Sequence, residues 1–176
     1  AIMGLKSGTS WINILKGVSN SIASTTPAII ILLLIGSLAG TWLISGIVPT
    51  MIYYGLQILN PKIFLVAAAI ICAIVSLASG SSWSTIATVG IALLGIGNAL
   101  DISNGLVAGA IISGAYFGDK MSPLSDTTNL APAMAGTDLF THIRYMMYTN
   151  IPSFLISLLI FLVIGLSLDN TQNSDD

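Results

Sequence analysis

The sequence predicts an all-α integral membrane protein, a polytopic helical bundle that contains broken or re-entrant helices. The first observation is composition: of 176 residues, 55% are hydrophobic and only 7% are charged, whereas an average soluble domain carries about 25% charged residues. The second is the distribution of charge, because the ranges 17–61, 63–100 and 145–168 contain no Asp, Glu, Lys or Arg. Each range is long enough to cross a hydrocarbon core, which takes about 20 helical residues.

The small number of charged and reactive side chains limits the kinds of partner that the sequence predicts. The formal net charge of −2 is small and gives no reason to expect a nucleic-acid partner. All seven acidic residues are Asp, and no set of Cys and His has the spacing of metal ligands. The single cysteine, Cys72, lies in an apolar run and is expected to pack in the core as a small hydrophobe. The lipid bilayer is therefore the first partner that the sequence predicts.

The N-terminal part is expected to form an interfacial segment followed by one membrane span. Residues 1–26 are mixed in polarity and rich in Ser and Thr, and their last part is compatible with an amphipathic helix. Pro27 suits the first turn of a helix, so the first span is predicted over 28–47 and is expected to be closed by Pro49. The membrane-embedded part is predicted to cover 27–168.

The apolar run 63–100 is too short for two ordinary spans and a turn, since two crossings take about 40 residues. Its centre, 79–85, reads Ser-Gly-Ser-Ser-Trp-Ser-Thr, which is a poor helix interior. We therefore predict two short arms, 63–78 and 86–100, on either side of an unwound segment. Broken helices of this kind form ion sites in several transporter folds.

A third short arm is predicted over 105–117, and it leads into the most polar segment of the chain, 114–131. Pro123 argues against one continuous helix through that segment. The last span is predicted to include 152–168, and the residues that follow, 169–176, form a polar tail.

Hydroxyl, amide and carboxylate side chains gather at the two predicted breaks. In hydrocarbon, a break is tolerated only where it is buried in protein or lines a wet cavity, because its backbone groups need partners. Its carbonyl and hydroxyl oxygens are then ligands for a hard cation such as Na⁺. The candidate ligands are Ser81, Ser82, Ser84 and Thr85 at the first break, and Ser125, Asp126, Thr127, Thr128 and Asn129 at the second.

Asp119 and Asp126 are candidates for coupling the movement of an ion to protons. The ordinary pKa of an Asp side chain is about 3.9, and burial raises the pKa of a carboxyl group. A buried Asp can therefore bind either H⁺ or a metal cation. Competition for one site couples the two ions if the site opens to one side of the membrane at a time. Helix dipoles at a break also attract anions, so this argument leaves the sign of the ion open.

Purely structural explanations compete with these assignments. Asp119 and Lys120 fit a surface loop with a local ion pair, and this explanation is stronger for Lys120. The sequence Ser125-Asp126-Thr127 fits a helix N-cap, where such residues are preferred. The Ser and Thr side chains of 79–85 fit hydrogen bonds to helix carbonyls one turn back.

The residues at these breaks resemble the NhaC-type Na⁺/H⁺ antiporter family, which belongs to a wider group of ion transporters. The resemblance is carried by Gly80-Ser81-Ser82-Trp83-Ser84-Thr85 and by the motif over 109–131, which ends in Gly118-Asp119-Lys120-Met121-Ser122-Pro123-Leu124-Ser125-Asp126-Thr127-Thr128-Asn129-Leu130-Ala131. Shorter matches lie at 40–42, 49–56 and 142–144, and the resemblance covers about 20–168.

The resemblance implies a secondary active transporter that exchanges Na⁺ for H⁺ across a bacterial or archaeal cytoplasmic membrane and contributes to pH homeostasis. It implies no enzyme activity and no cofactor beyond the transported ions. Asp119 and Asp126 would carry the coupling, and Asp126 stands where the wider group often has Asn, a departure that favours proton coupling. The family resemblance also implies an inverted-repeat fold of which this chain is one half, with the second half missing.

Two other interpretations stay open. Some members of the family exchange malate for lactate, so an ion-coupled carboxylate exchanger is the first alternative. Such a protein needs a cationic or donor-rich pocket, for which Lys120 and Arg144 are the central cations. The second alternative is a non-transporting fragment. The residues leave the formation of homo-oligomers open.

Overall fold

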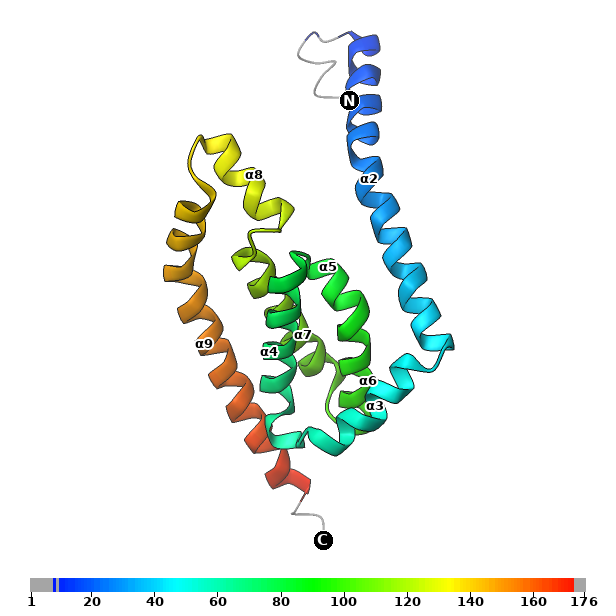
Figure 1. Ribbon diagram of the computed structural model, residues 1–176, viewed down its shortest axis with the longest axis vertical. Helices are drawn as coiled ribbons and strands as arrows, with labels where there is room; N and C mark the ends of the chain where they lie inside the picture. Colours follow the sequence, from blue (N-terminus) through cyan, green and yellow to red (C-terminus); the bar gives the residue numbers. More distant parts are fainter. Residues whose placement is uncertain (1–7, 9, 173–176) are drawn as a thin grey trace. The chain divides into compact units, whose positions relative to one another are not determined.

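The computed structural model describes residue 8 and residues 10–172, and all regular structure in this part is helical (Figure 1). The chain divides into two compact units, Ala1–Ser37 and Leu38–Asp176, which we describe separately. In chain order the elements are α2 (Trp11–Ile44), α3 (Ile47–Ile58), α4 (Pro61–Ser79), α5 (Ser82–Thr85), the π-helical turn η1 (Ile86–Gly90), α6 (Ile91–Ala99), α7 (Asn104–Met121), α8 (Asp126–Ala135) and α9 (Leu139–Gln172).

Helix α2 provides the regular structure of the first unit and ends in the second. It runs through Pro27 as one helix, so the predicted separation of an interfacial helix from a span that begins at this proline is wrong. Proline is tolerated inside membrane helices because neighbouring groups satisfy the carbonyl that it frees. The predicted end at Pro49 is also wrong, because Gly46, with φ 82°, separates the helices and Pro49 lies in the first turn of α3.

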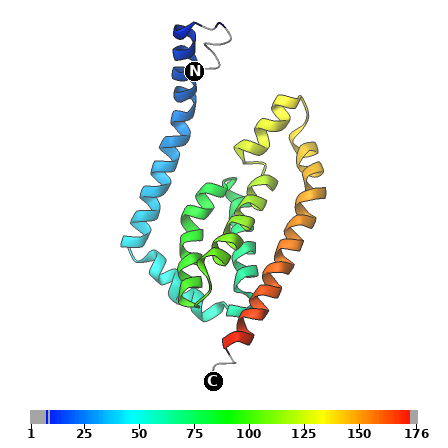
Figure 2. The ribbon, with the colours of Figure 1, turned by 180° about the vertical axis from the view of Figure 1, so that it is seen from behind.

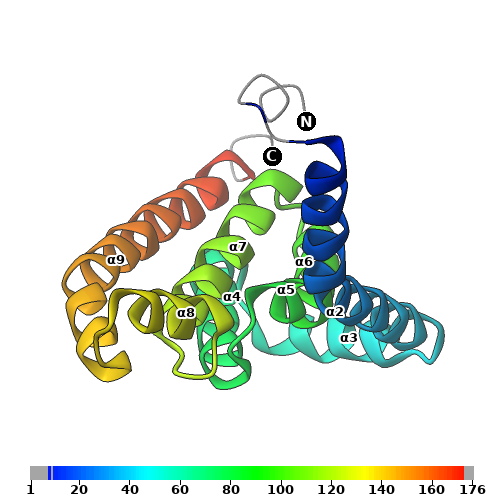
Figure 3. The same cartoon turned by 90° about the horizontal axis from the view of Figure 1, so that it is seen from above.

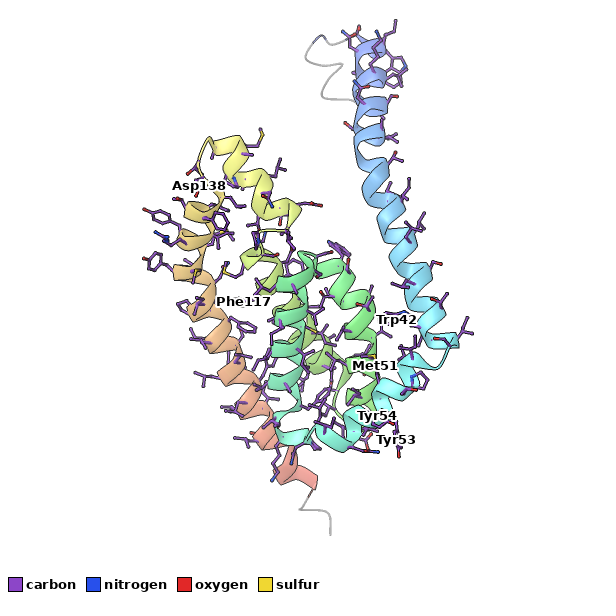
Figure 4. The ribbon with its side chains drawn as sticks, viewed as in Figure 1. Trp42, Met51, Tyr53, Tyr54, Phe117 and Asp138 are labelled. Carbon is purple, nitrogen blue, oxygen red and sulfur yellow. The ribbon has the colours of Figure 1, made fainter. Side chains whose placement is uncertain are left out.

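Helix α3 packs on α6 and carries an exposed aromatic pair. A Cβ at Gly95 of α6 would lie 2.5 Å from Cδ1 of Ile52, so the small residue permits close contact between the two helices. Tyr53 and Tyr54 are exposed, and their rings meet edge to face with centroids 5.3 Å apart (Figure 4). Exposed tyrosines of this kind suit the membrane–water interface.

Helices α4 and α7 form the centre of the second unit. Gly114 and Gly118 lie one turn apart on α7, and a Cβ on either would collide with a backbone carbonyl oxygen of α4, at Ala69 or Ala73. Small residues at this spacing let two membrane helices approach closely. Cys72 is buried and free, as expected. The buried core around it also includes Phe64, Leu65, Ala68, Val107, Ala110, Ile111 and Ala115.

The predicted interruption after the first arm is present but shorter than 79–85. Helix α4 ends at Ser79, and only Gly80 and Ser81 separate it from α5. Ser82–Thr85 form a helical turn that continues through η1 into α6, so the prediction that they are unwound is wrong. The Ser81 side chain accepts a hydrogen bond from the Ser84 backbone N–H at 3.2 Å. This cap begins the new helix at once.

Three helices in the described part are long and apolar enough to cross a membrane, judged by length and composition. They are Pro61–Ser79, Ser82–Ala99 and Leu139–Ser167. This result agrees with the predicted all-α membrane fold. Helix α7 is one turn longer than the predicted arm 105–117 and ends before Pro123, which therefore interrupts the polar segment as predicted.

Helix α9 is one continuous helix of 34 residues that passes through Pro152. It contacts α4 and α7 along the second unit (Figures 1 and 2), and the Phe117 and Phe154 rings stack with centroids 4.2 Å apart (Figure 4). Helix α8 contacts both α7 and α9 (Figure 3). Of the predicted tail, residues 169–172 belong to α9, and 173–176 lie outside the described residues, as do 1–7 and 9 of the N-terminal segment.

Candidate functional site

A hydrogen bond between two buried side chains joins the two helix interruptions. The Ser82 hydroxyl Oγ donates to the Asp119 carboxylate Oδ2 at 3.0 Å. Ser82 is 2% exposed and Asp119 is 9% exposed. Asp119 lies near the end of α7 and Ser82 begins α5, so residues 37 positions apart in the sequence meet here. The alternative in which Asp119 belongs to a surface loop is wrong.

The first interruption is held in place by close contact with the second. Gly80 has φ 71°, a left-handed conformation that favours glycine. A Cβ there would lie 2.6 Å from the backbone carbon of Leu124, between α7 and α8. Ser122 adds a hydrogen bond, because its Oγ donates to the Leu77 carbonyl oxygen at 2.8 Å. The two interruptions therefore form one junction, which we call the α4/α5–α7/α8 junction.

Thr128 and Asn129 close this junction from α8. The last carbonyls of a helix have no partner within it. Thr128 Oγ1 donates to the carbonyl oxygens of Asp119 and Lys120, at 3.2 and 3.3 Å. Asn129 Nδ2 donates to the carbonyl oxygens of Pro123 and Ser125, at 2.6 and 2.8 Å. Both side chains fix the backbone around Asp119 and so have a structural role in this arrangement.

The other predicted residues of the second interruption are arranged less tightly. Ser125 is buried, and its Oγ lies 3.1 Å from Thr127 Oγ1. Ser125 occupies the N-cap position of α8, as the structural alternative to an ion ligand predicted. Its side chain, however, makes no capping hydrogen bond with the described residues. Asp126 and Thr127 are exposed in the first turn of α8. The structure thus brings Asp119, but not Asp126, into contact with the Ser82 hydroxyl.

Hydroxyl groups of the first interruption make hydrogen bonds within their own helical turn. Thr85 is buried, and its Oγ1 donates to the Ser81 carbonyl oxygen at 2.9 Å, which is the back-bonding alternative. Ser84 Oγ donates to Ser81 Oγ at 3.0 Å. Among the described residues, no group of three or more His, Cys, Asp or Glu side chains could hold a metal ion. A cation at this junction would therefore take its ligands from Asp119 together with hydroxyl and carbonyl oxygens.

Two buried serines that connect α4 to α7 were not among the predicted site residues. Ser76 Oγ donates to the Ala115 carbonyl oxygen at 2.6 Å, and Ser122 makes the bond to Leu77 described above. Each was visible in the sequence as a hydroxyl inside or at the end of an apolar arm. Such side chains satisfy backbone groups across helices in hydrocarbon, so they stabilise the pair that carries Asp119.

The sequence is similar to those of several proteins named as antiporters. The sequence model described as the Na⁺/H⁺ antiporter family matches residues 114–175. An Na⁺/H⁺ antiporter NhaC of Alkalihalophilus pseudofirmus is 44% identical over 175 residues, which cover 99% of this chain and 38% of the relative. The chain is thus similar over nearly its whole length to part of Na⁺/H⁺ antiporters of the NhaC type. No solved structure is significantly similar to it.

Other relatives of the chain carry different names. A "Malate-2H(+)/Na(+)-lactate antiporter" of Bacillus subtilis is 47% identical over 164 residues, which cover 93% of this chain and 35% of that protein. An "Arginine/ornithine antiporter ArcD" of Halobacterium salinarum is 45% identical over 159 residues, covering 90% of this chain and 33% of that protein. The chain thus spans about a third of the length of these relatives. These relatives are named as antiporters, which are transporters and not enzymes.

Proposed function

We propose that the full-length protein exchanges Na⁺ for H⁺ across the cytoplasmic membrane, and that Asp119 binds the two ions in turn. One observation carries the proposal: a buried carboxylate accepts a hydrogen bond from a buried hydroxyl at the meeting point of two interrupted helices. Ionisable side chains within membrane helices are costly and usually serve transport. Similarity to Na⁺/H⁺ antiporters supports the choice of ions.

The Ser82 hydroxyl is suited to every state of the exchange. A hydroxyl is one donor and has two acceptor lone pairs, and it rotates to suit its partner. Its O–H group donates to the Asp119 carboxylate in the arrangement described above. With Na⁺ bound, the same oxygen would turn a lone pair towards the cation. When Asp119 is protonated instead, the hydroxyl oxygen would accept a hydrogen bond from the carboxyl O–H group.

The remaining predicted residues would complete and shape the site. Ser81 and Thr85 supply oxygens in the same turn as Ser82, and Thr128 holds the carbonyl of Asp119 in place. Asp126 would add a second negative charge at the start of α8, where it attracts a cation from the exposed side. We propose that the rest of the full-length protein, which is longer than this chain in the relatives, contains an inverted repeat that covers this side.

The reaction is tested by measuring proton movement in liposomes that contain the full-length protein. With an imposed pH gradient, we expect Na⁺ added outside to dissipate the gradient, whereas an equal concentration of K⁺ does not. The membrane potential is clamped in both cases, so that a leak driven by charge is excluded. The proposal would be contradicted if the pH gradient dissipated without Na⁺. It would also be contradicted if Na⁺ caused no dissipation in liposomes that contain monodisperse protein.

A second candidate function is ion-coupled carboxylate exchange. It is favoured by the identity of 47% to the relative named for malate and lactate. In the same liposomes, proton movement that requires malate on one side and lactate on the other, and does not occur with Na⁺ alone, would favour this candidate over Na⁺/H⁺ exchange.

A further inference from the structure

A polar groove lies on another side of α7, between this helix, α8 and α9. One cavity of about 250 Å³ is lined by polar residues that include Tyr116, Lys120, Asn150, Ser153 and Ser157. A second cavity of about 320 Å³ is lined by Lys120 and Asn150 as well, together with Thr127, Thr128 and His142. Because the two cavities share two residues, we treat them as one groove, which we call the Lys120 groove.

The groove has a positive charge and several neutral donors. Within the described part of the chain, the Lys120 ammonium group makes no ion pair and no hydrogen bond. No Asp or Glu is among the described residues that line the two cavities. The carboxylate of the neighbouring Asp119 is instead bonded to Ser82 on α5. The Asn150 amide and the hydroxyls of Ser153 and Ser157 surround the space near the ammonium group.

This combination selects against a metal cation and for an anion. A partly buried ammonium group repels Na⁺, and it loses hydration that an ion of opposite charge can replace. The Asn150 amide N–H₂ group and the Ser153 hydroxyl can donate hydrogen bonds to the oxygens of such an ion. The Ser157 hydroxyl donates to the Ser153 carbonyl oxygen at 3.0 Å and must rotate away from it to do the same. Bonds from ammonium to carboxylate or phosphate are the strong, charge-assisted class. The Asp119 junction and the Lys120 groove therefore have opposite preferences for charge.

We propose that the Lys120 groove binds an oxyanion, which is the carboxylate of a water-soluble molecule or the phosphate of a lipid. Lys120 supplies the charge, and Asn150 with the serines of α9 supplies neutral hydrogen-bond donors. Oxyanion binding in the groove goes beyond Na⁺/H⁺ exchange. It does not depend on whether Asp119 couples the two ions. The competing explanation is that the Lys120 stem covers apolar surface while its ammonium group is only hydrated.

A cysteine placed in the groove reports the sign of the charge that the groove favours. In the full-length protein, native cysteines including Cys72 are replaced by Ser, and Ser157→Cys is introduced as the reporter. The rates of modification by a negatively charged sulfonate methanethiosulfonate and a positively charged trimethylammonium methanethiosulfonate are then compared in phosphatidylcholine liposomes. We expect Lys120→Gln to lower the rate with the anionic reagent by about fivefold and to raise the rate with the cationic reagent by a similar factor, the effect of one unit charge at close range in water. The ratio of the anionic to the cationic rate should therefore fall by about 25-fold.

Two further variants serve as controls. Lys120→Arg keeps the charge and should keep the ratio. Arg144→Gln removes an exposed cation of α9 that lines neither cavity, so it should also leave the ratio unchanged. Each variant must elute as monodisperse protein in size-exclusion chromatography. An equal ratio in the parent and in monodisperse Lys120→Gln would overturn the proposal, and so would a reporter that neither reagent modifies.

Competition identifies the source of the oxyanion. Slower modification by the anionic reagent in the presence of malonate supports a water-soluble carboxylate. Slower modification only when the liposomes contain phosphatidylglycerol supports a lipid phosphate. If neither malonate nor phosphatidylglycerol slows the anionic reagent, the groove merely attracts negative charge and the binding proposal is wrong. None of these measurements depends on transport, so they are independent of the liposome flux test.

Discussion

Replacing Ser82 with Ala removes one hydroxyl from the α4/α5–α7/α8 junction and adds no new atom. The hydroxyl donates to Asp119 Oδ2 at 3.0 Å, and both side chains are buried. A hydrogen bond to a charged group is worth about 1.5–3 kcal/mol. In the variant, the ionised carboxylate loses this hydrogen bond and a bound Na⁺ loses one ligand. A protonated carboxyl group loses less stabilisation. H⁺ should therefore compete better with Na⁺ for Asp119.

We take the lower end of that range, because the protonated carboxyl group also loses a hydrogen bond with Ser82 and only the difference between the two forms affects the competition. At 1.36 kcal/mol for each factor of ten, the Na⁺ concentration for half-maximal exchange should rise by about tenfold at fixed pH. Na⁺-dependent proton movement in liposomes measures this concentration. Ser79→Ala is the matched control, since Ser79 is exposed and donates to the Ser76 carbonyl instead. A half-maximal concentration unchanged by Ser82→Ala would refute the assigned role of Ser82.

Two further predictions concern the framework that carries Asp119. Gly114→Ala places a Cβ against the Ala69 carbonyl oxygen, so we expect a loss of about 1–3 kcal/mol in the free energy of unfolding, measured by thermal unfolding in detergent. Gly109→Ala has no atom within 4 Å of the new Cβ and should not be destabilised; equal midpoints for the two variants would contradict the close packing. Thr128→Val keeps the shape of the side chain but removes its bonds to the last carbonyls of α7. It should cost about 1 kcal/mol of stability, and a midpoint at or above that of the parent would show that these bonds do not hold the junction.

The membrane class and the interruptions of the helices could be predicted from the sequence because both depend on local composition. Scarce charge predicted apolar helices, and Pro123 marked the end of α7 correctly. The predicted bounds of the breaks were less accurate. Because Ser81 caps a new helix that begins at Ser82, the first break takes only two residues, Gly80 and Ser81. Pro27 misled the prediction, since a proline is compatible with a continuous membrane helix when neighbouring groups satisfy the carbonyl that it frees.

Contacts between distant residues could not be predicted from one sequence. Asp119 and Asp126 looked equivalent as carboxylates, and only the tertiary structure buries the first against Ser82 and leaves the second exposed. Lys120 follows Asp119 directly, yet it lines a groove with Asn150 of α9. That pairing depends on how α9 returns along α7, and no local pattern encodes it.

The central claim is that Asp119 is the carboxylate at which Na⁺ and H⁺ compete. Its most direct test is the uptake of radioactive ²²Na⁺, driven by a pH gradient, into liposomes that contain the full-length protein with Asp119→Asn or Asp126→Asn. The asparagine has nearly the same shape, but it cannot take up the proton or balance the cation. We predict that Asp119→Asn abolishes uptake and that Asp126→Asn retains measurable uptake. Uptake at the parent rate in monodisperse Asp119→Asn protein would contradict the account.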